Sequence, residues 1–288
     1  MQRLIAVFFV ISTILISQSS VAAQKSVWSD AESFSAPESV YYNSADKTLY
    51  ISNVVGAGDK KDGKGWISKI KPDGKVVSVK WVDKLNAPKG MRSQNGTLWV
   101  SDIDRVVAID IKSGKIKSSI NIAGSKFLND IAIAPDDTVY VSDTQGATIY
   151  KIKDGKASVF LTGEILEAPN GLLYKDGKLY VAGWGKGIKP DWSTTDVGRI
   201  YCIDLKTKKM TYITKKPLGN LDGLEMDSDG NFIVSDWVAG KIYKVDLKGK
   251  SKLIFEGKKG IADIAYIPST QMVVVPQMQE NEVTAIKY

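Results

Sequence analysis

The stretch Thr138-Val-Tyr-Val-Ser142 decides the fold, because a strand of this pattern occurs six times along the chain. The other copies are Thr48-Leu-Tyr-Ile-Ser52, Thr97-Leu-Trp-Val-Ser101, Lys178-Leu-Tyr-Val-Ala182, Asn231-Phe-Ile-Val-Ser235 and Gln271-Met-Val-Val-Val275. Their second residues are 49, 41, 40, 53 and 40 positions apart. A repeat of about 40 residues is the length of one four-stranded propeller blade. The sequence therefore predicts an all-β fold, a six-bladed β-propeller.

The remaining strands of each unit follow in order. In the third unit, Ile149-Tyr-Lys-Ile152 is followed by the turn Lys153-Asp-Gly155 and by a fourth strand, Lys156-Ala-Ser-Val-Phe160. The sixth unit stops at Tyr288, after its third strand. A matching fourth strand occurs at the other end, in Lys25-Ser-Val-Trp-Ser-Asp30. We therefore expect the N-terminal strand to close the ring by completing the last blade, which removes an open sheet edge.

The first residues resemble a targeting signal. A short basic start, Met1–Arg3, precedes an apolar run of 13 residues, Leu4–Ile16, and small residues lead to Ala23. This order is typical of a secretory signal peptide. We expect a signal peptide at 1–23, a propeller at 24–288, and a secreted or periplasmic protein. A membrane helix needs roughly 20 apolar residues, so no stable membrane anchor is expected.

Composition excludes several classes of function. The chain has 39 Lys and Arg against 32 Asp and Glu, spread over many turns, which indicates a solvated surface and no nucleic-acid binding. It contains no histidine, which excludes Ser-His-Asp and Cys-His catalysis. Cys202 is the only cysteine, so no intramolecular disulfide forms, and we expect it to be a buried small hydrophobe. A monomer acting on a small molecule is the expectation.

One position at the start of each unit's first strand recurs in phase with the repeat. It is occupied, in chain order, by Glu38, Lys89, Asn129, Asn170, Asp222 and Ala262. The spacings are 51, 40, 41, 52 and 40 residues. In a propeller the first strand of every blade lines the central channel. These six residues are therefore predicted to form a ring around the axis, which we call the ring position.

Four members of the ring position carry side-chain oxygens: Glu38, Asn129, Asn170 and Asp222. Two unpaired carboxylates brought together cost several kcal/mol, which a divalent cation removes. Oxygen-only ligands favour a hard ion, and calcium's loose coordination suits a few side chains plus water. We predict a Ca²⁺ site, with another divalent cation as the alternative. Asn170 and Asp222 each precede glycine and could instead be turn residues, whereas Glu38 is a poor turn former.

A family resemblance rests on the same residues. Glu38-Ser-Val-Tyr41, Asn129-Asp130, Pro169-Asn170-Gly171-Leu172 and Asp222-Gly223 resemble the calcium-ligand set of the senescence marker protein (regucalcin)/gluconolactonase family. More distantly they are similar to diisopropyl fluorophosphatase and paraoxonases. The likeness covers essentially all of residues 24–288. It implies a calcium held by the four ring residues, hydrolysis of a lactone or related ester, and Asp222 as both ligand and base or nucleophile.

The resemblance has a limit, and it leaves a second function open. Paraoxonases use a histidine dyad, which this chain lacks. The implied mechanism has calcium polarise the substrate carbonyl while Asp222, or Asp130 behind it, accepts the proton of water. The alternative is a non-catalytic ligand-binding or sensing propeller of NHL-like type, because the fold hosts both.

Substrate contacts are expected from a lysine and two insertions. Lys89, at the ring position of the second unit, could pair with Asp130, Asp222 or a substrate carboxylate, or could simply extend its tip to water. The two long repeats carry insertions at 54–65 and 184–198, between the second and third strands, which should stand over the mouth of the channel. Trp184 and Trp192 lie in the second insertion as candidate substrate-binding residues. Tolerated surface length is the other explanation of the insertions.

Overall fold

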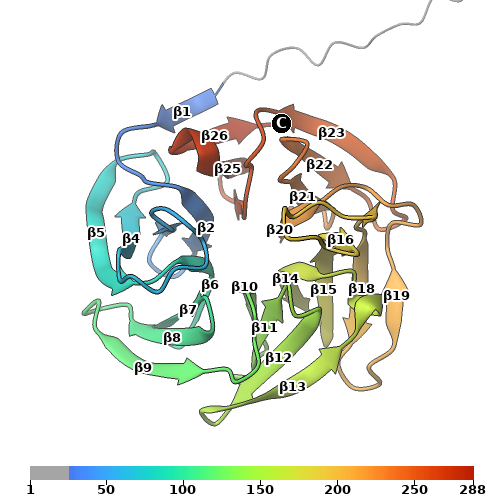
Figure 1. Cartoon of the computed structure of the whole chain (residues 1–288). Helices are drawn as coiled ribbons and strands as arrows, with labels where there is room; N and C mark the ends of the chain where they lie inside the picture. The colour runs from blue at the N-terminus through green and yellow to red at the C-terminus, as the bar shows by residue number, and fades with distance from the viewer. Residues whose placement is uncertain (1–25) are drawn as a thin grey trace, which may run out of the picture.

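The computed structural model describes residues 26–288, and the predicted signal peptide at 1–23 lies outside them. In this part of the chain, six four-stranded antiparallel sheets surround a central axis, as Figure 1 shows. The chain passes around the ring once, blade after blade, so that β1 lies beside β26 (Figure 1). The predicted six-bladed β-propeller is confirmed.

Each blade is an antiparallel meander whose strands follow one another from the axis outward. Blade 1 contains β2 (Pro37–Asn43), β3 (Thr48–Asn53), β4 (Gly65–Ile70) and β5 (Val76–Leu85). Blade 2 contains β6 (Pro88–Gln94), β7 (Thr97–Asp102), β8 (Arg105–Asp110) and β9 (Ile116–Asn121). Blade 3 contains β10 (Leu128–Ile133), β11 (Val139–Asp143), β12 (Thr148–Lys153) and β13 (Lys156–Thr162).

The second half of the ring repeats this order with one addition. Blade 4 contains β14 (Pro169–Lys175), β15 (Lys178–Gly183), β18 (Ile200–Asp204) and β19 (Met210–Tyr212), with a separate hairpin of β16 (Gly185–Lys186) and β17 (Asp196–Val197). Blade 5 contains β20 (Leu221–Met226), β21 (Phe232–Asp236), β22 (Lys241–Val245) and β23 (Ser251–Glu256). Blade 6 contains β24 (Ala265–Ile267), β25 (Met272–Gln277), β26 (Glu282–Lys287) and β1 (Ser26–Asp30).

Helix contributes little to the described part of the chain. Two single-turn 3₁₀ segments are present, η1 (Glu164–Leu166) and η2 (Met278–Glu280). Within residues 26–288 no helix has the length and apolar character needed to cross a membrane.

The repeated strand is the buried centre of each blade. In β11 all five residues are buried, and Val139 and Val141 pair with Ile152 and Tyr150 of β12. Strands that are covered on both faces read as nearly continuous apolar runs, which explains the recurring pattern. The cores form between neighbouring blades rather than within them, so each sheet depends on the next one for the burial of its apolar face.

The ring closes as predicted, by pairing of the first and last described strands. In β1, Ser29 and Asp30 pair with Thr284 and Val283 of β26. Trp28 extends the closure to blade 1, because its indole N–H donates to the carbonyl of Pro72 at 2.9 Å. One cluster of buried side chains spans blades 1 and 6. The seam is therefore packed like any other interface between blades.

Candidate functional site

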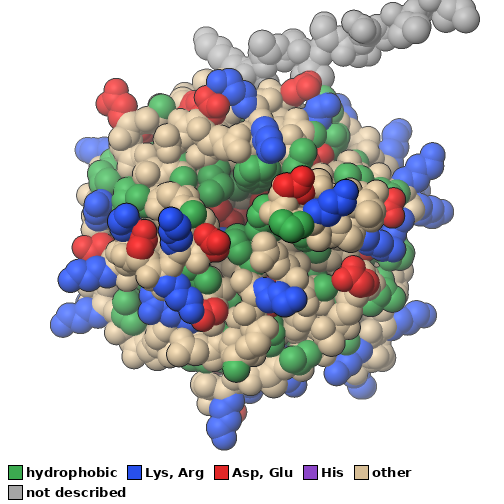
Figure 2. All heavy atoms as spheres, in the orientation of Figure 1, with side chains coloured by type: hydrophobic (Ala, Val, Ile, Leu, Met, Phe, Trp, Pro, Cys, Tyr) green, Lys and Arg blue, Asp and Glu red, His purple; other side chains and the backbone are tan. Residues whose placement is uncertain are grey.

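Five of the six residues at the ring position, all except Ala262, line the buried part of a cavity at one end of the channel. This cavity has a volume of about 800 Å³. It opens on the face that carries β16, where Figure 2 shows a hollow at the centre of the molecule. All four residues predicted as metal ligands line it: Glu38, Asn129, Asn170 and Asp222. None of the four is more than 4% exposed, so the structure brings them together in one enclosed site.

A β-bulge at the start of the inner strand in blades 1 to 5 turns the ring residue toward the axis. The pairing of β10 with β11 shifts between Leu128 and Ile131, and that of β20 with β21 shifts between Leu221 and Leu224. Strands β2 and β14 carry the equivalent shift. A bulge re-aims one side chain relative to the regular alternation of a strand. The ring residue can therefore face the cavity while the following residues pack in the blade.

A serine at the end of the repeated strand stabilises this geometry. The Ser142 hydroxyl accepts the N–H of Asp130 at 2.8 Å and donates to the carbonyl of Asn170 at 2.6 Å. Ser235 makes the corresponding pair of bonds, both of 2.8 Å, two blades further on. Each serine thus links the bulge of its own blade to the ring residue of the next blade. The sequence displays this serine in four of its six repeats, but its role was not predicted.

One oxygen atom of each predicted ligand has no partner. Glu38 Oε2, Asn129 Oδ1, Asn170 Oδ1 and Asp222 Oδ1 are buried and accept no hydrogen bond within residues 26–288. Buried polar atoms of this kind are rare and costly. Here they come from four different strands and line the same cavity. A hard cation coordinated by these oxygens, together with water, would satisfy all four atoms, so the residues fit such a group.

The two carboxyl groups of the site are electrostatically strained. Burial, and then the charge of Asp222, hold the pKa of Glu38 well above its usual value. Burial, and then the charge of Asp130, raise the pKa of Asp222 to about 8, although a hydrogen bond from Asn170 opposes the shift. Within residues 26–288 no three Asp, Glu, His or Cys side chains gather as a metal site. Any ion here would be held by two carboxylates and two amides.

Lys89 is buried beside these carboxyls and is held by backbone. Its ammonium donates to the carbonyl oxygens of Gly58 at 2.9 Å and Ala87 at 3.0 Å, and it lies 4.2 Å from the ring centre of Phe127. Only 2% of the residue is exposed. Burial lowers the pKa of Lys89, and the charge of Glu38 opposes this. The tip therefore does not extend to water, and it turns toward carbonyls rather than toward Asp130 or Asp222.

Asp130 follows the ring residue of blade 3 but does not line the cavity. Its carboxylate accepts the N–H of Ile131 at 2.6 Å and of Leu172 at 2.7 Å, and Arg92 approaches to 3.9 Å. Burial raises the pKa of Asp130, while Arg92 and these two bonds act in the opposite direction. Both oxygens are engaged away from the cavity. Of the two residues predicted as the base, Asp222 lines the cavity and Asp130 does not.

An aromatic wall forms one side of the cavity. Trp184 and Trp192, predicted from the second insertion, both line it. Phe127 and Trp237 also line it and were not predicted. Phe127 lies two residues before Asn129, and Trp237 directly follows the repeated Ser-Asp at the end of β21. Their position in the repeat was visible in the sequence, but the direction of their side chains was not.

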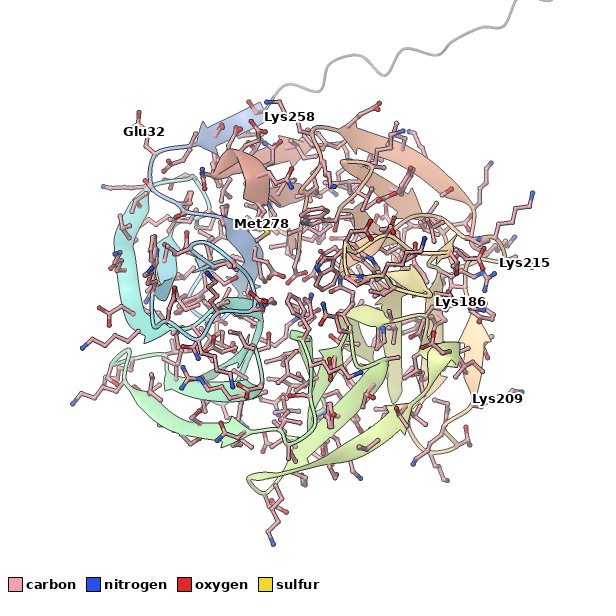
Figure 3. The ribbon with its side chains drawn as sticks, viewed as in Figure 1. Glu32, Lys186, Lys209, Lys215, Lys258 and Met278 are labelled. Carbon is pink, nitrogen blue, oxygen red and sulfur yellow. The ribbon has the colours of Figure 1, made fainter. Side chains whose placement is uncertain are left out.

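Both insertions stand at the mouth of the cavity, as predicted. Residues 57–59 of the first insertion line it, and so do Trp184 before the β16–β17 hairpin and residues 191–194 between its two strands. Asn220 fixes the second insertion by donating to the Trp184 carbonyl at 2.9 Å and to Thr194 Oγ1 at 3.1 Å. In Figure 3, Lys186 marks the hairpin and Met278, another lining residue, lies on the inner side of blade 6.

Comparison with solved structures identifies the same fold in several enzymes. The chain is similar to a gluconolactonase from Xanthomonas campestris, with a TM-score of 0.64 and 16% identity over 88% of this chain and 86% of that one. A putative gluconolactonase gives the same TM-score and identity over 93% and 92%. The chain is also similar to an inactive histidine-to-alanine variant of virginiamycin B lyase from Staphylococcus aureus, solved with quinupristin. The TM-score is 0.60, and the identity is 14% over 88% of this chain and 94% of that one.

These similarities establish the fold. No family model matches the chain, and no curated protein sequence matches it. A gluconolactonase and a putative gluconolactonase are among the solved structures that share its fold, in agreement with the resemblance seen in the sequence.

Proposed function

We propose that this chain is a secreted or periplasmic hydrolase of lactones or related esters, and that it requires a divalent cation, calcium. The observation that supports the proposal is the set of four unpartnered oxygens of Glu38, Asn129, Asn170 and Asp222 in one buried cavity. Gluconolactonases among the structural neighbours add support for the lactone substrate.

The four ring residues would hold the cation, with water completing its coordination. When bound, the ion supplies a Lewis acid for the acyl oxygen and lowers the pKa of water. The chain's own part is to accept a proton. Asp222 lines the cavity, so its carboxylate is placed to take the proton of the attacking water. Water then adds to the acyl carbon, the bond to the ring oxygen breaks, and the proton passes to the leaving alkoxide. The product is a hydroxy acid.

Lyase chemistry of the virginiamycin B lyase type receives less support. That enzyme is described as inactive when one histidine is replaced by alanine, and the present chain contains no histidine. Hydrolysis with a carboxylate as base needs none.

The test compares Asp222→Asn with the wild type on a panel of lactones and esters in the presence of calcium. Asp222→Asn should lose at least about 100-fold in kcat, the scale of general-base catalysis, while the circular dichroism spectrum stays unchanged. Asp59→Asn, at the exposed rim of the cavity, is the matched control and should retain activity. Full activity of Asp222→Asn would refute its role as base. Calcium binding by the wild type without turnover of any panel member would favour the non-catalytic ligand-binding propeller.

A further inference from the structure

Four aromatic rings form a continuous wall along one side of the cavity. Phe127 contacts Trp192 with ring centres 4.7 Å apart, Trp192 contacts Trp184 at 5.6 Å, and Trp184 contacts Trp237 at 6.0 Å. The planes are inclined by 67°, 75° and 52°. These are the inclined arrangements that aromatic rings prefer. The wall is therefore a built surface and not a chance gathering of exposed residues.

Hydrogen bonds fix the segments that carry these rings before any ligand arrives. The Trp184 indole N–H donates to the Trp192 carbonyl at 3.1 Å, and the N–H of Phe127 donates to Asp143 at 2.8 Å. The N–H of Trp237 donates to the carbonyl of Asn220 at 3.0 Å. A surface that is fixed in advance loses little conformational freedom when a ligand packs against it.

Trp192 adopts a backbone conformation that bulky residues avoid. Its φ is 66°, in the left-handed region where glycine or asparagine is usual. The turn is closed by its N–H, which donates to the carbonyl of Lys189 at 2.9 Å. Strained backbone of this kind gathers at functional sites. In this chain it brings an indole ring, rather than a small turn residue, to the wall of the cavity.

Two polar side chains beside the wall, Ser193 and Asn220, are already engaged in hydrogen bonds. Ser193 Oγ donates to Asp191 at 2.7 Å. Asn220 donates to the Trp184 carbonyl and to Thr194. A polyhydroxylated sugar ring needs hydrogen-bond partners around its edge, and a site that leaves hydroxyls unpaired binds them poorly. On this side the cavity offers mainly ring surfaces, with the ammonium of Lys259 lying 5.3 Å from the ring centre of Trp237.

We propose that the natural substrate carries an aromatic ring next to the reacting lactone or ester, and that this ring packs against Phe127, Trp192 and Trp237. The inference rests on the proposed function for the identity of the reacting group. It specifies the substrate class, an aryl-substituted lactone or ester rather than a sugar lactone.

The test separates binding from turnover. Phenyl-substituted δ-valerolactam keeps the ring shape of the lactone but resists hydrolysis, so its affinity can be measured by calorimetry whether or not the protein is an enzyme. Cyclohexyl-substituted and polyhydroxylated δ-lactams serve as matched probes. We expect the phenyl lactam to bind at least about tenfold more tightly than either, which corresponds to about 1.4 kcal/mol.

Variants locate the contact. Trp192→Ala and Trp237→Leu should each weaken binding of the phenyl lactam by about tenfold and leave the polyhydroxylated lactam unaffected. Trp99 packs against the apolar cluster between blades 2 and 3 and does not line the cavity. Trp99→Phe is therefore the control, and it should change the affinity for neither lactam. Two variants from different elements are used so that misfolding of one does not decide the result.

The outcomes distinguish the two proposals. Equal or tighter binding of the cyclohexyl or polyhydroxylated lactam overturns the aromatic subsite, as does unchanged affinity in both folded variants. Hydrolysis of sugar lactones and phenyl lactones with equal kcat/KM would also overturn it, while leaving the hydrolase proposal intact. Selective phenyl-lactam binding with no turnover of the phenyl lactone would refute the hydrolase and retain the subsite.

Discussion

At the scale of single residues, the site is defined by carboxyls kept out of water. Glu38 and Asp222 face the same cavity, and both have raised pKa values because burial disfavours ionisation, as do the charge of Asp222 on Glu38 and that of Asp130 on Asp222. Lys89 is near enough to lower the pKa of Glu38, but its hydrogen bonds go to backbone. A bound cation would stabilise the ionised carboxyls more completely than this lysine does.

The pH dependence of stability should report the raised pKa of Asp222 directly. In unfolded chain Asp222 has a pKa near 3.8, and in the folded protein it rises to about 8. Between these values the folded protein retains a proton that the unfolded chain releases, so the free energy of unfolding falls as pH rises through this window. Thermal unfolding with a chelator should therefore give a Tm that falls from pH 5 to pH 8.

Calcium should stabilise the folded protein more strongly as pH rises over the same range, because it binds the ionised carboxyls. The increase in Tm on adding calcium should grow from pH 5 to pH 8. Asp222→Asn, which removes one of the titrating carboxyls, should reduce the slope of both trends. A Tm in chelator that stays constant or increases over this range would contradict the assigned pKa shifts.

The ring residues were predictable because they share one phase of the repeat. Glu38 and Asp222 are far apart in sequence, yet each opens the first strand of its unit. The partners of Lys89 were not predictable, because they are the carbonyls of Gly58 and Ala87, and one of these lies in an insertion with no counterpart in most repeats. Whether a side chain meets a carboxylate or a carbonyl depends on backbone path, which periodicity does not give.

At the scale of elements, the end of the repeated strand fixes the segment that leads into the inner strand of its own blade. A Ser-Asp pair closes β7, β11 and β21. The Asp member binds backbone N–H groups of the segment that leads into its blade: Asp143 accepts those of Lys126 and Phe127 at 2.9 and 2.8 Å. The pair was visible as part of the repeat, but its hydrogen bonds cross to residues some 16 positions earlier, which sequence pattern does not reveal.

The second insertion is held by a close contact between Gly198 and the backbone of Gly183 at its base. A Cβ at Gly198 would lie 1.8 Å from the carbonyl oxygen of Gly183, where β15 ends. Gly198→Ala must therefore displace backbone, and we expect it to cost about 1–3 kcal/mol of unfolding free energy and to weaken phenyl-lactam binding, because the Trp184 and Trp192 rings move. Denaturant unfolding and calorimetry measure the two effects.

Gly58→Ala in the first insertion is the control. Its Cβ would be in ordinary contact with Phe127 at 3.6 Å, and its φ is not in the left-handed region. The change in stability should be within about 0.5 kcal/mol. Equal effects of the two substitutions would show that the close contact at Gly198 does not constrain the insertion.

At the scale of the whole molecule, cooperativity follows from closure of the ring. β1 completes blade 6, and Trp28 connects it to blade 1. Phe34, which follows β1, is buried between the same two blades. Loss of this segment exposes the edge of β26 and opens the seam.

Deletion of residues 26–34 should lower the free energy of unfolding by at least about 3–5 kcal/mol, the cost of losing one buried Phe, and should broaden the single transition. Val27→Ala, at a side chain that is 51% exposed, should change it by no more than about 0.5 kcal/mol. Equilibrium unfolding in urea compares the three proteins. A deletion variant as stable as the wild type would mean that the blades do not depend on closure.

The number of blades and the closing strand followed from the sequence because a propeller repeats one unit and each copy preserves the apolar centre. The shape of the cavity did not follow. It depends on bulges such as that between Leu128 and Ile131 and on where Phe127 and Trp237 point, and these are set by contacts between blades rather than within one repeat.

Calcium titration of the metal-free protein by calorimetry tests the central claim most directly. The account predicts that one ion binds per chain with a Kd below about 1 mM, which corresponds to a binding free energy of more than about 4 kcal/mol in magnitude. Binding should be abolished by Glu38→Gln and by Asn170→Ala, and retained by Asp59→Asn. No heat of binding at millimolar calcium, or unchanged affinity in Glu38→Gln, would contradict it.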